Sequence, residues 1–226
     1  MMKRMTACLG LLIAAPGIAA AQEKIAISIG GVELEAPMPA GYCLPTGKNK
    51  AAADLLAAAD TENVTHASLF RCDQMATEAG PGNDYYLLKT PRRALVATVS
   101  RPELIAGLAR EFGKAEWQEG GTKAASLTEK ASGSISETFN ARVEVKGSFS
   151  PRGTDADCVY MGGEATVSMP DISYPIQAGA CLTSVGNKMI TVYTYDDPKG
   201  SDGVVRLMRR AQALAMAFKP VAGKTP

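Results

Sequence analysis

The residues best suited to chemistry in this chain are three acids that lie close to glycines. Asp155 and Asp157 stand directly before Cys158, and Glu164 follows Gly162-Gly163. Paired carboxylates can act as general acid and base, or they can bind calcium. A calcium loop needs oxygen ligands at more positions than this stretch provides, and a turn into a strand explains the same residues. We therefore expect no metal site here, and hydrolysis by this acidic cluster is the alternative to a binding role.

His66 is the one histidine of the chain, and it lies in an alternating run from Val64 to Phe70. It is a possible general base for the acidic cluster, but a histidine in a strand is more often hydrogen-bonded within the fold. A single histidine excludes HExxH and histidine-paired zinc sites, and without a Gly-x-Ser-x-Gly motif no nucleophile completes a triad. No Walker loop or dinucleotide fingerprint occurs, so we expect no cofactor and favour a protein without catalytic activity.

Three arginines, Arg206, Arg209 and Arg210, cluster near the end of the chain, and Lys219 follows them. On the outer face of a helix they would suit an acidic partner or a lipid headgroup. The ordinary interpretation is a solvated helix face, with its cations toward the negative end of the helix dipole.

The beginning of the chain is typical of an export signal. Lys3 and Arg4 precede an apolar run from Ala7 to Ile18, and small residues end at Ala21, just before Gln22. The run is about half of the roughly 20 residues that cross a bilayer, so we prefer a cleaved signal over residues 1–21 to an uncleaved anchor. This predicts a periplasmic protein with no membrane span after signal removal.

Four cysteines remain after such cleavage: Cys43, Cys72, Cys158 and Cys181. In an oxidising compartment they predict two disulfides, for which three pairings exist. We favour Cys43–Cys72 and Cys158–Cys181, because each closes a loop of moderate length. Neither the Cys-x-x-Cys of a redox couple nor the close ligand pairs of a zinc site occur.

Charge excludes one class of partner. Loss of Lys3 and Arg4 lowers the 24 basic residues to 22 against 23 acidic ones, so the mature charge is −1. A nearly neutral chain has no overall field for nucleic acid. An envelope protein or a small ligand is therefore the expected partner.

Two glycines and several hydrophobic patterns predict the elements. Gly30-Gly31 between two alternating runs predicts a hairpin, and Ser100 to Glu103 form a capping box with proline that starts a helix ending at Gly113. We expect further helices at 49–60 and from 201 or 202 to 218. We expect further strands at 64–71, 85–89, 93–99, 142–150, 157–161, 165–169, 174–183 and 188–195.

The stretch from residue 114 to residue 140 has few apolar side chains. We expect a long polar loop there, or a weak helix over 124–130, and a possible soft domain boundary. The whole pattern predicts a single α+β domain over 22–219, with a mainly antiparallel sheet covered by two or three amphipathic helices. We expect a disordered tail over 220–226.

The hairpin Ile29-Gly-Gly-Val-x-Leu34, the segment Pro39-Ala-Gly-Tyr-Cys43 and a later strand ending at Cys72 resemble a group of uncharacterised exported bacterial proteins. The resemblance covers about the first 70 residues and implies a Gram-negative envelope location. It implies no catalytic residue. Together these observations favour a periplasmic protein that binds an envelope partner or a small ligand.

Overall fold

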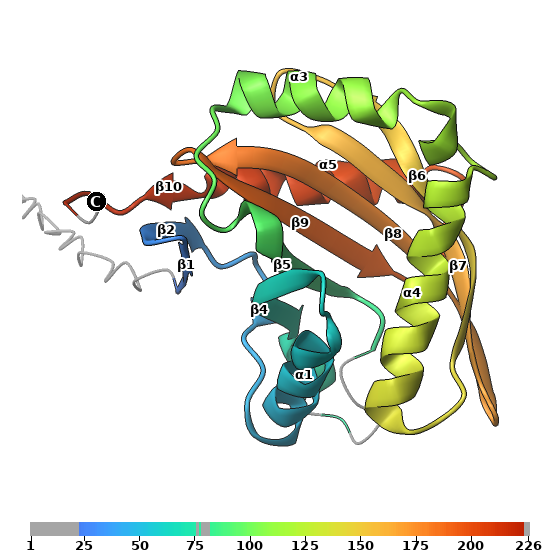
Figure 1. The fold of residues 1–226 in the computed structure, drawn as a ribbon. Helices are drawn as coiled ribbons and strands as arrows, with labels where there is room; N and C mark the ends of the chain where they lie inside the picture. Colours follow the sequence, from blue (N-terminus) through green and yellow to red (C-terminus); the bar gives the residue numbers. More distant parts are fainter. Residues whose placement is uncertain (1–22, 76, 78–81, 224–226) are drawn as a thin grey trace, which may run out of the picture.

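A computed structural model describes residues 23–75, 77 and 82–223 of the chain. The signal expected over residues 1–21 lies outside these residues. The described part has two antiparallel sheets, one of seven strands in the order β3-β4-β5-β9-β8-β7-β6 and one of three in the order β1-β2-β10 (Figure 1). The strands are β1 (Lys24–Ile29), β2 (Val32–Pro37), β3 (Tyr42–Cys43), β4 (Asn63–Arg71), β5 (Tyr85–Pro91), β6 (Glu144–Thr154), β7 (Val159–Met169), β8 (Ile172–Val185), β9 (Lys188–Asp196) and β10 (Lys219–Pro220).

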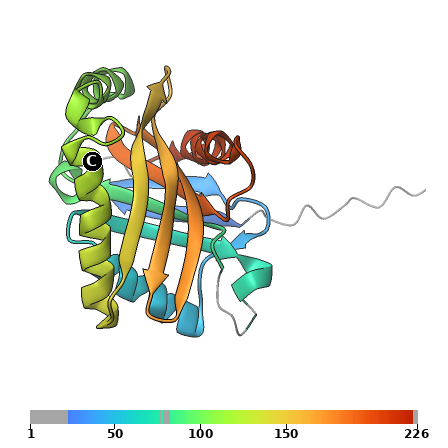
Figure 2. The ribbon, with the colours of Figure 1, turned by 90° about the vertical axis from the view of Figure 1, so that its right-hand side faces the viewer.

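Helices lie on both faces of the large sheet, with α5 on one side and α3 and α4 on the other (Figure 2). The helical elements are α1 (Gly47–Ala59), α2 (Cys72–Met75), η1 (Arg92–Ala94), α3 (Arg101–Phe112), η2 (Ala115–Trp117), α4 (Thr122–Phe139) and α5 (Gly203–Ala217). No helix within the described ranges combines the length and the apolar content that a bilayer crossing requires. The predicted α+β fold with a mainly antiparallel sheet is confirmed.

The main core lies between the large sheet, the β1–β2 hairpin and α5. Alternate residues of β1 and β2 point inward, and α5 contributes a buried stripe that includes Leu207, Ala211 and Leu214. Helix α5 comes very close to β8, because a Cβ on Gly179 would stand 2.6 Å from the backbone nitrogen of Met208. Only glycine permits this approach.

A second core covers the opposite face of the sheet. Phe112 of α3 packs there with Met161, Leu182 and other apolar side chains of the central strands. Helix α3 starts with the predicted capping box, in which the Glu103 carboxylate accepts the backbone N–H of Ser100 at 3.1 Å. At the end of α3, the ring of Phe112 packs against that of Trp117 in η2, with a distance of 4.8 Å between the ring centroids.

The polar stretch after residue 114 forms a long helix, which corrects the expectation of a loop or a short weak helix. Helix α4 has 18 residues and lies along the edge strand β6. Ser136 accepts the backbone N–H of Val143 at 2.9 Å, and Ser132 accepts that of Val145 at 2.9 Å. These serines satisfy edge N–H groups that would otherwise remain unpaired, and they hold the helix together with the buried Ala124 and with Leu127, which packs against the second core.

The strand expected over 93–99 is also wrong, because this segment forms η1 followed by turns. The buried ammonium of Lys188 donates to the carbonyls of Leu95, Val96 and Ala97 at 3.5, 3.4 and 3.1 Å. In a β-strand successive carbonyls point to opposite sides. Three successive carbonyls that all bind Lys188 are therefore incompatible with a strand.

Both predicted disulfides are confirmed, and each has a Cα–Cα distance of 5.3 Å. The predicted hairpin turn is confirmed too, with φ of 54° at Gly30 and 84° at Gly31. The chain end expected to be disordered from residue 220 begins inside the small sheet, because Pro220 lies opposite Leu34. Ordered backbone therefore continues past residue 220, while residues 224–226 lie outside the described part.

Candidate functional site: a hollow around Arg101

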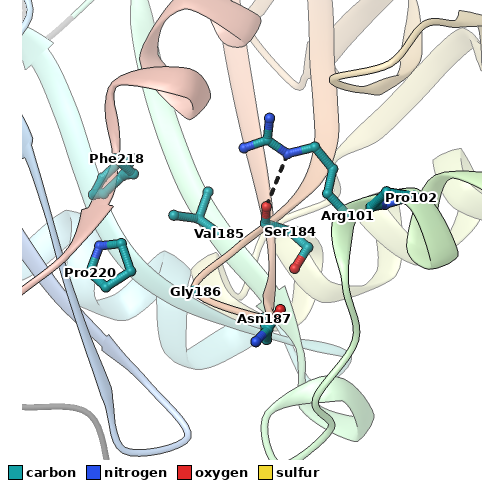
Figure 3. A pocket seen from close by; sticks show the side chains of 8 residues that line it. All are labelled: Arg101, Pro102, Ser184, Val185, Gly186, Asn187, Phe218 and Pro220. Carbon is teal, nitrogen blue, oxygen red and sulfur yellow. Dashed lines mark hydrogen bonds between the residues drawn. The ribbon is translucent and has the colours of Figure 1, made fainter.

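An open hollow of about 520 Å³ lies where the start of α3, the β8–β9 turn and strand β10 meet (Figure 3). The elements come from distant parts of the chain, and the hollow is lined by Arg101, Pro102, Ser184, Val185, Gly186, Asn187, Phe218 and Pro220. Apolar side chains make up one side and a guanidinium the other.

The approach to α3 is fixed by bonds to the end of the β8–β9 hairpin. The hydroxyl of Ser184 donates to the carbonyl of Val99 at 2.7 Å, and the N–H of Val99 donates to the carbonyl of Asn187 at 3.0 Å. Lys188 holds the preceding carbonyls. The backbone just before Arg101 is therefore held in place by hydrogen bonds to Ser184, Asn187 and Lys188.

Two contacts orient the Arg101 side chain. Its Nε donates to the carbonyl oxygen of Ser184 at 3.2 Å, and Nη1 donates to Oδ1 of Asp157 at 3.2 Å. Nη2 has no acceptor among the described residues, and about a third (34%) of the side chain is exposed. Figure 3 shows the guanidinium extending from α3 over Ser184, toward the side where Val185 and Phe218 lie. The structure thus presents an oriented cation with unused donors.

The apolar side of the hollow is rigid because its side chains belong to the main core. Val185 and Phe218 are 5% and 3% exposed. Pro220 lies next to them and is paired with β2. A guanidinium beside a fixed apolar wall suits a ligand with one anionic group and one apolar group.

Asp155 and Asp157, two of the predicted acids, lie close to each other in the turn between β6 and β7. Oδ1 of Asp155 accepts the N–H groups of Asp157 and Cys158 at 2.8 Å each, and Oδ2 accepts the Tyr160 hydroxyl at 2.6 Å. Burial alone would raise the pKa of Asp155, but these bonds outweigh it and hold the pKa below its ordinary value. Asp155 is therefore a turn-stabilising carboxylate, whereas Asp157 orients Arg101.

Glu164, the third acid, lies apart from them on β7. It accepts a bond from Gln177 at 2.7 Å and lines a separate hollow of about 210 Å³. The strand path from Val159 to Glu164 spans about 16 Å, so Glu164 does not reach the turn that holds Asp155 and Asp157. The structure does not bring the three acids to one site.

His66 lies far from the acids. It is the extra residue in a bulge of β4, where its Nε2 lies 3.0 Å from Oγ1 of Thr90, which donates to the carbonyl of Met189 at 2.9 Å. Burial lowers the pKa of His66. Four strand spacings separate β4 from β7, or about 19 Å, so His66 cannot serve Asp155 or Asp157 as a base.

The structure separates the three arginines expected on one outer face. Arg210 stacks over Tyr42 and Tyr86 and pairs with Asp84 at 2.8 Å, so it is part of the packing of α5. Arg206 lies 3.8 Å from Asp196, and only Arg209 is exposed. Lys219 is exposed on β10.

No group of three or more metal-ligating side chains occurs in the part of the chain that the structure describes. Sequence reasoning missed Arg101, although the signal was present. The residue stands at the first position of a well-capped helix, where the preceding loop fixes its direction. The pairing with Asp157 depends on contacts that only the folded sheet creates.

A row of aromatic rings was also missed. It crosses the face of the sheet that α3 and α4 flank, and successive ring centroids from Phe70 through Tyr85, Tyr195 and Tyr193 to Phe149 are 5.7, 4.5, 6.4 and 6.1 Å apart. Burial raises the pKa of Tyr193 to about 12. The spacing of Tyr193 and Tyr195 on one strand, with both side chains on the same face, was the available signal.

Comparisons with known proteins give little. No protein-family model matches the chain, and a search of curated proteins finds no match. Among solved structures, the solution structure of cyanobacterial PsbP (CyanoP) from Synechocystis sp. PCC 6803 is similar, with 12% sequence identity and a TM-score of 0.41. The match covers 94% of this chain and 100% of that one. A likeness of this size assigns no function.

Proposed function

We propose that this chain is an exported periplasmic protein that acts by binding and not by catalysis, and that it takes an anionic ligand in the hollow around Arg101. The observation that carries the binding role is the Arg101 guanidinium, which two contacts orient and whose Nη2 has no acceptor among the described residues. Because the Arg101 side chain is already ordered before a ligand binds, binding loses less side-chain entropy.

Two features support export. The first residues are typical of a cleaved signal, and two disulfides connect the four remaining cysteines. Disulfides persist in oxidising compartments and are rare in the bacterial cytosol.

The separation of the candidate catalytic groups supports binding over catalysis. Asp155 is used by its own turn, Glu164 lies in another hollow, and His66 is bonded within β4 and β5. General acid–base catalysis needs its groups within hydrogen-bond reach of one substrate. Among the described residues these three do not meet that condition.

The binding role is tested by NMR titration of the purified protein with three anions, namely benzoate, inorganic phosphate and sulfate. We expect at least one of them to shift the amide signals of Gly186 and Asn187 and the Nε signal of Arg101. Arg101→Gln should abolish these shifts, whereas Arg209→Gln, which removes an exposed arginine elsewhere, should leave them unchanged. Absence of any Arg101-dependent shift contradicts the proposed site.

Export is tested by expressing the full chain in a Gram-negative host. We expect the mature protein in the periplasmic fraction, with Gln22 as its first residue and no titratable thiol. Retention in the cytosol with an intact Met1 contradicts this part of the proposal.

A further inference from the structure

We infer that the ligand of the Arg101 hollow is a monocarboxylate carried on a compact apolar group. This inference rests on the proposed binding function and specifies the chemistry of its ligand. Three features of the hollow support it, namely the charge around Arg101, the geometry of its free donors and the composition of the opposite wall.

The charge around Arg101 favours a single negative charge. Asp157 already pairs with the guanidinium on one side, so the two residues together carry no net charge. The attraction to Arg101 and the repulsion from Asp157 both grow in proportion to the charge of the ligand. The cost of removing an ion from water grows faster than its charge, so a dianion such as phosphate loses more on entering this partly covered place than a monocarboxylate does.

The free donors also favour a planar anion. Nε is bound to Ser184 and Nη1 to Asp157, so the two N–H groups of Nη2 remain, and they lie in the plane of the guanidinium, where a planar carboxylate can accept them. The start of α3 does not compete as an anion site, because the Glu103 carboxylate already accepts the Ser100 N–H at 3.1 Å and its hydroxyl at 2.6 Å. The guanidinium itself is thus the anion-binding group.

The wall opposite the guanidinium limits the rest of the ligand. Val185 and Phe218 are held in the core and form its base, while the exposed Pro102 and Pro220 supply the accessible apolar surface. Their contribution is burial of apolar surface, at roughly 25 cal/mol for each Å² removed from water. The hollow of about 520 Å³ is open to solvent, and its apolar surface is small, so we infer an apolar group of about one side chain or one ring.

Two sources carry this chemistry, a free small acid and the carboxyl terminus of a peptide. The experiment therefore titrates the purified protein with benzoate, 4-methylpentanoate and the peptide acetyl-Ala-Leu with a free carboxyl end. Each acid is compared with its uncharged amide, and inorganic phosphate, at a pH where it is mainly doubly charged, is the dianion control. Binding is followed by the NMR signals of Gly186, Asn187 and the Arg101 Nε.

Four variants separate the contributions. Arg101→Gln removes the guanidinium, and Arg101→Lys keeps the charge but loses the paired donors. Asp157→Asn removes the opposing charge, and Arg209→Gln is the matched control on an exposed arginine. Signals of α4 and α1, which are remote from the hollow, report whether each variant is folded.

We expect at least one acid to bind while its amide does not, and Arg101→Gln to weaken the acid at least about ten-fold, which is 1.4 kcal/mol. Arg101→Lys should weaken it several-fold, and Arg209→Gln should change nothing. Asp157→Asn should improve the binding of phosphate more than that of the acid. Tighter binding of the peptide acid or of the small acids identifies the source, and either result supports the carboxylate assignment.

Two results would overturn the inference. Equal binding of acid and amide removes the role of the carboxylate. Arg101-dependent binding of phosphate that is tighter than that of every acid refutes the preference for a monoanion, while leaving the anion-binding function intact. If no probe produces an Arg101-dependent shift, the proposed function fails together with the inference.

Discussion

Nη1 of Arg101 lies 3.2 Å from Oδ1 of Asp157, although the two residues are 56 positions apart in the chain. Arg101 starts α3 and Asp157 ends the turn before β7. Their contact fastens the first turn of the helix to the sheet and gives the hollow its oriented cation.

Asp157→Asn should leave the free energy of unfolding within about 1 kcal/mol of the native value, because ion pairs this exposed contribute little to stability. About 34% of the Arg101 side chain and 43% of the Asp157 side chain are accessible to solvent. Urea unfolding measures the change. A loss of more than about 2 kcal/mol would show that the pair is structural, since only buried pairs cost that much to break.

Gly179→Ala should destabilise the protein by about 1–3 kcal/mol, because the new methyl group must push α5 away from β8. Its Cβ would meet the backbone of Met208 and Leu207 at 2.6 and 2.8 Å. Gly133→Ala is the matched control, since that position on α4 has no neighbouring atom within 4 Å. This control should gain about 0.5–1 kcal/mol of helix stability, and a similar loss in both variants would contradict the role of Gly179.

Removal of either disulfide by paired Cys→Ala substitution should cost about 3.5 kcal/mol on the chain-entropy account. The bridges close loops of 29 and 23 residues, which are similar enough to predict similar losses. Guanidinium chloride unfolding of the Cys43/Cys72 and Cys158/Cys181 variants measures this. A loss at Cys158/Cys181 far above that at Cys43/Cys72 would show that packing of these fully buried sulfurs contributes more than loop closure does.

His66 should make the protein less stable below neutral pH. Burial lowers the pKa of His66 in the folded state from 6.5, so the unfolded chain takes up the proton at a higher pH than the folded chain. The free energy of unfolding should therefore fall as the pH drops below 6.5, by no more than about 1.4 kcal/mol per pH unit.

The measurement is urea unfolding of the native protein and of His66→Asn at pH 7.5 and pH 5.5. His66 is the one histidine of the chain, so no other imidazole titrates in this range. An equal loss in both proteins would assign the pH dependence to other groups.

Lys188→Met should cost at least about 2 kcal/mol, because three carbonyls lose a charged donor in a buried place. Hydrogen exchange should also increase in the segment from Leu95 to Ala97, which these bonds hold. Lys219→Met, at an exposed position, should change stability by less than about 0.5 kcal/mol. Unchanged exchange in Lys188→Met would mean that other contacts position this loop.

The sequence predicts correctly those elements whose structure depends on residues a few positions apart. The Gly30-Gly31 turn and the capping box of Ser100 and Glu103 follow from backbone conformations and side-chain bonds within a few positions. The disulfides followed from counting cysteines and preferring short loops. These features do not require knowledge of the rest of the fold.

Two wrong predictions, for α4 and for the segment after Arg93, concern elements whose structure depends on hydrogen bonds to residues far away in the sequence. Helix α4 comes from a stretch with few apolar side chains, and Ser132 and Ser136 help to bond it to the edge of β6. The turns after Arg93 exist because Lys188, almost a hundred positions later, collects their carbonyls. Hydrophobic periodicity detects neither kind of contact.

The candidate site was predicted in part. The sequence predicts Asp157 as a possible catalytic acid, whereas in the structure its carboxylate orients Arg101. The guanidinium could not be found from its own surroundings in the sequence, because its partners are a carbonyl on β8 and a carboxylate beyond α4. Chemistry that depends on tertiary contacts becomes visible only with the fold.

The packing of Trp117 against Phe112 has a practical consequence. This is the one indole of the chain, and it stands at the far end of α3 from Arg101, about 18 Å along a helix of this length. Its ultraviolet emission will therefore report the separation of η2 from α3, and it will not respond to binding at the opposite end of α3. The protein carries its own optical reporter for local opening, separate from any readout of occupancy.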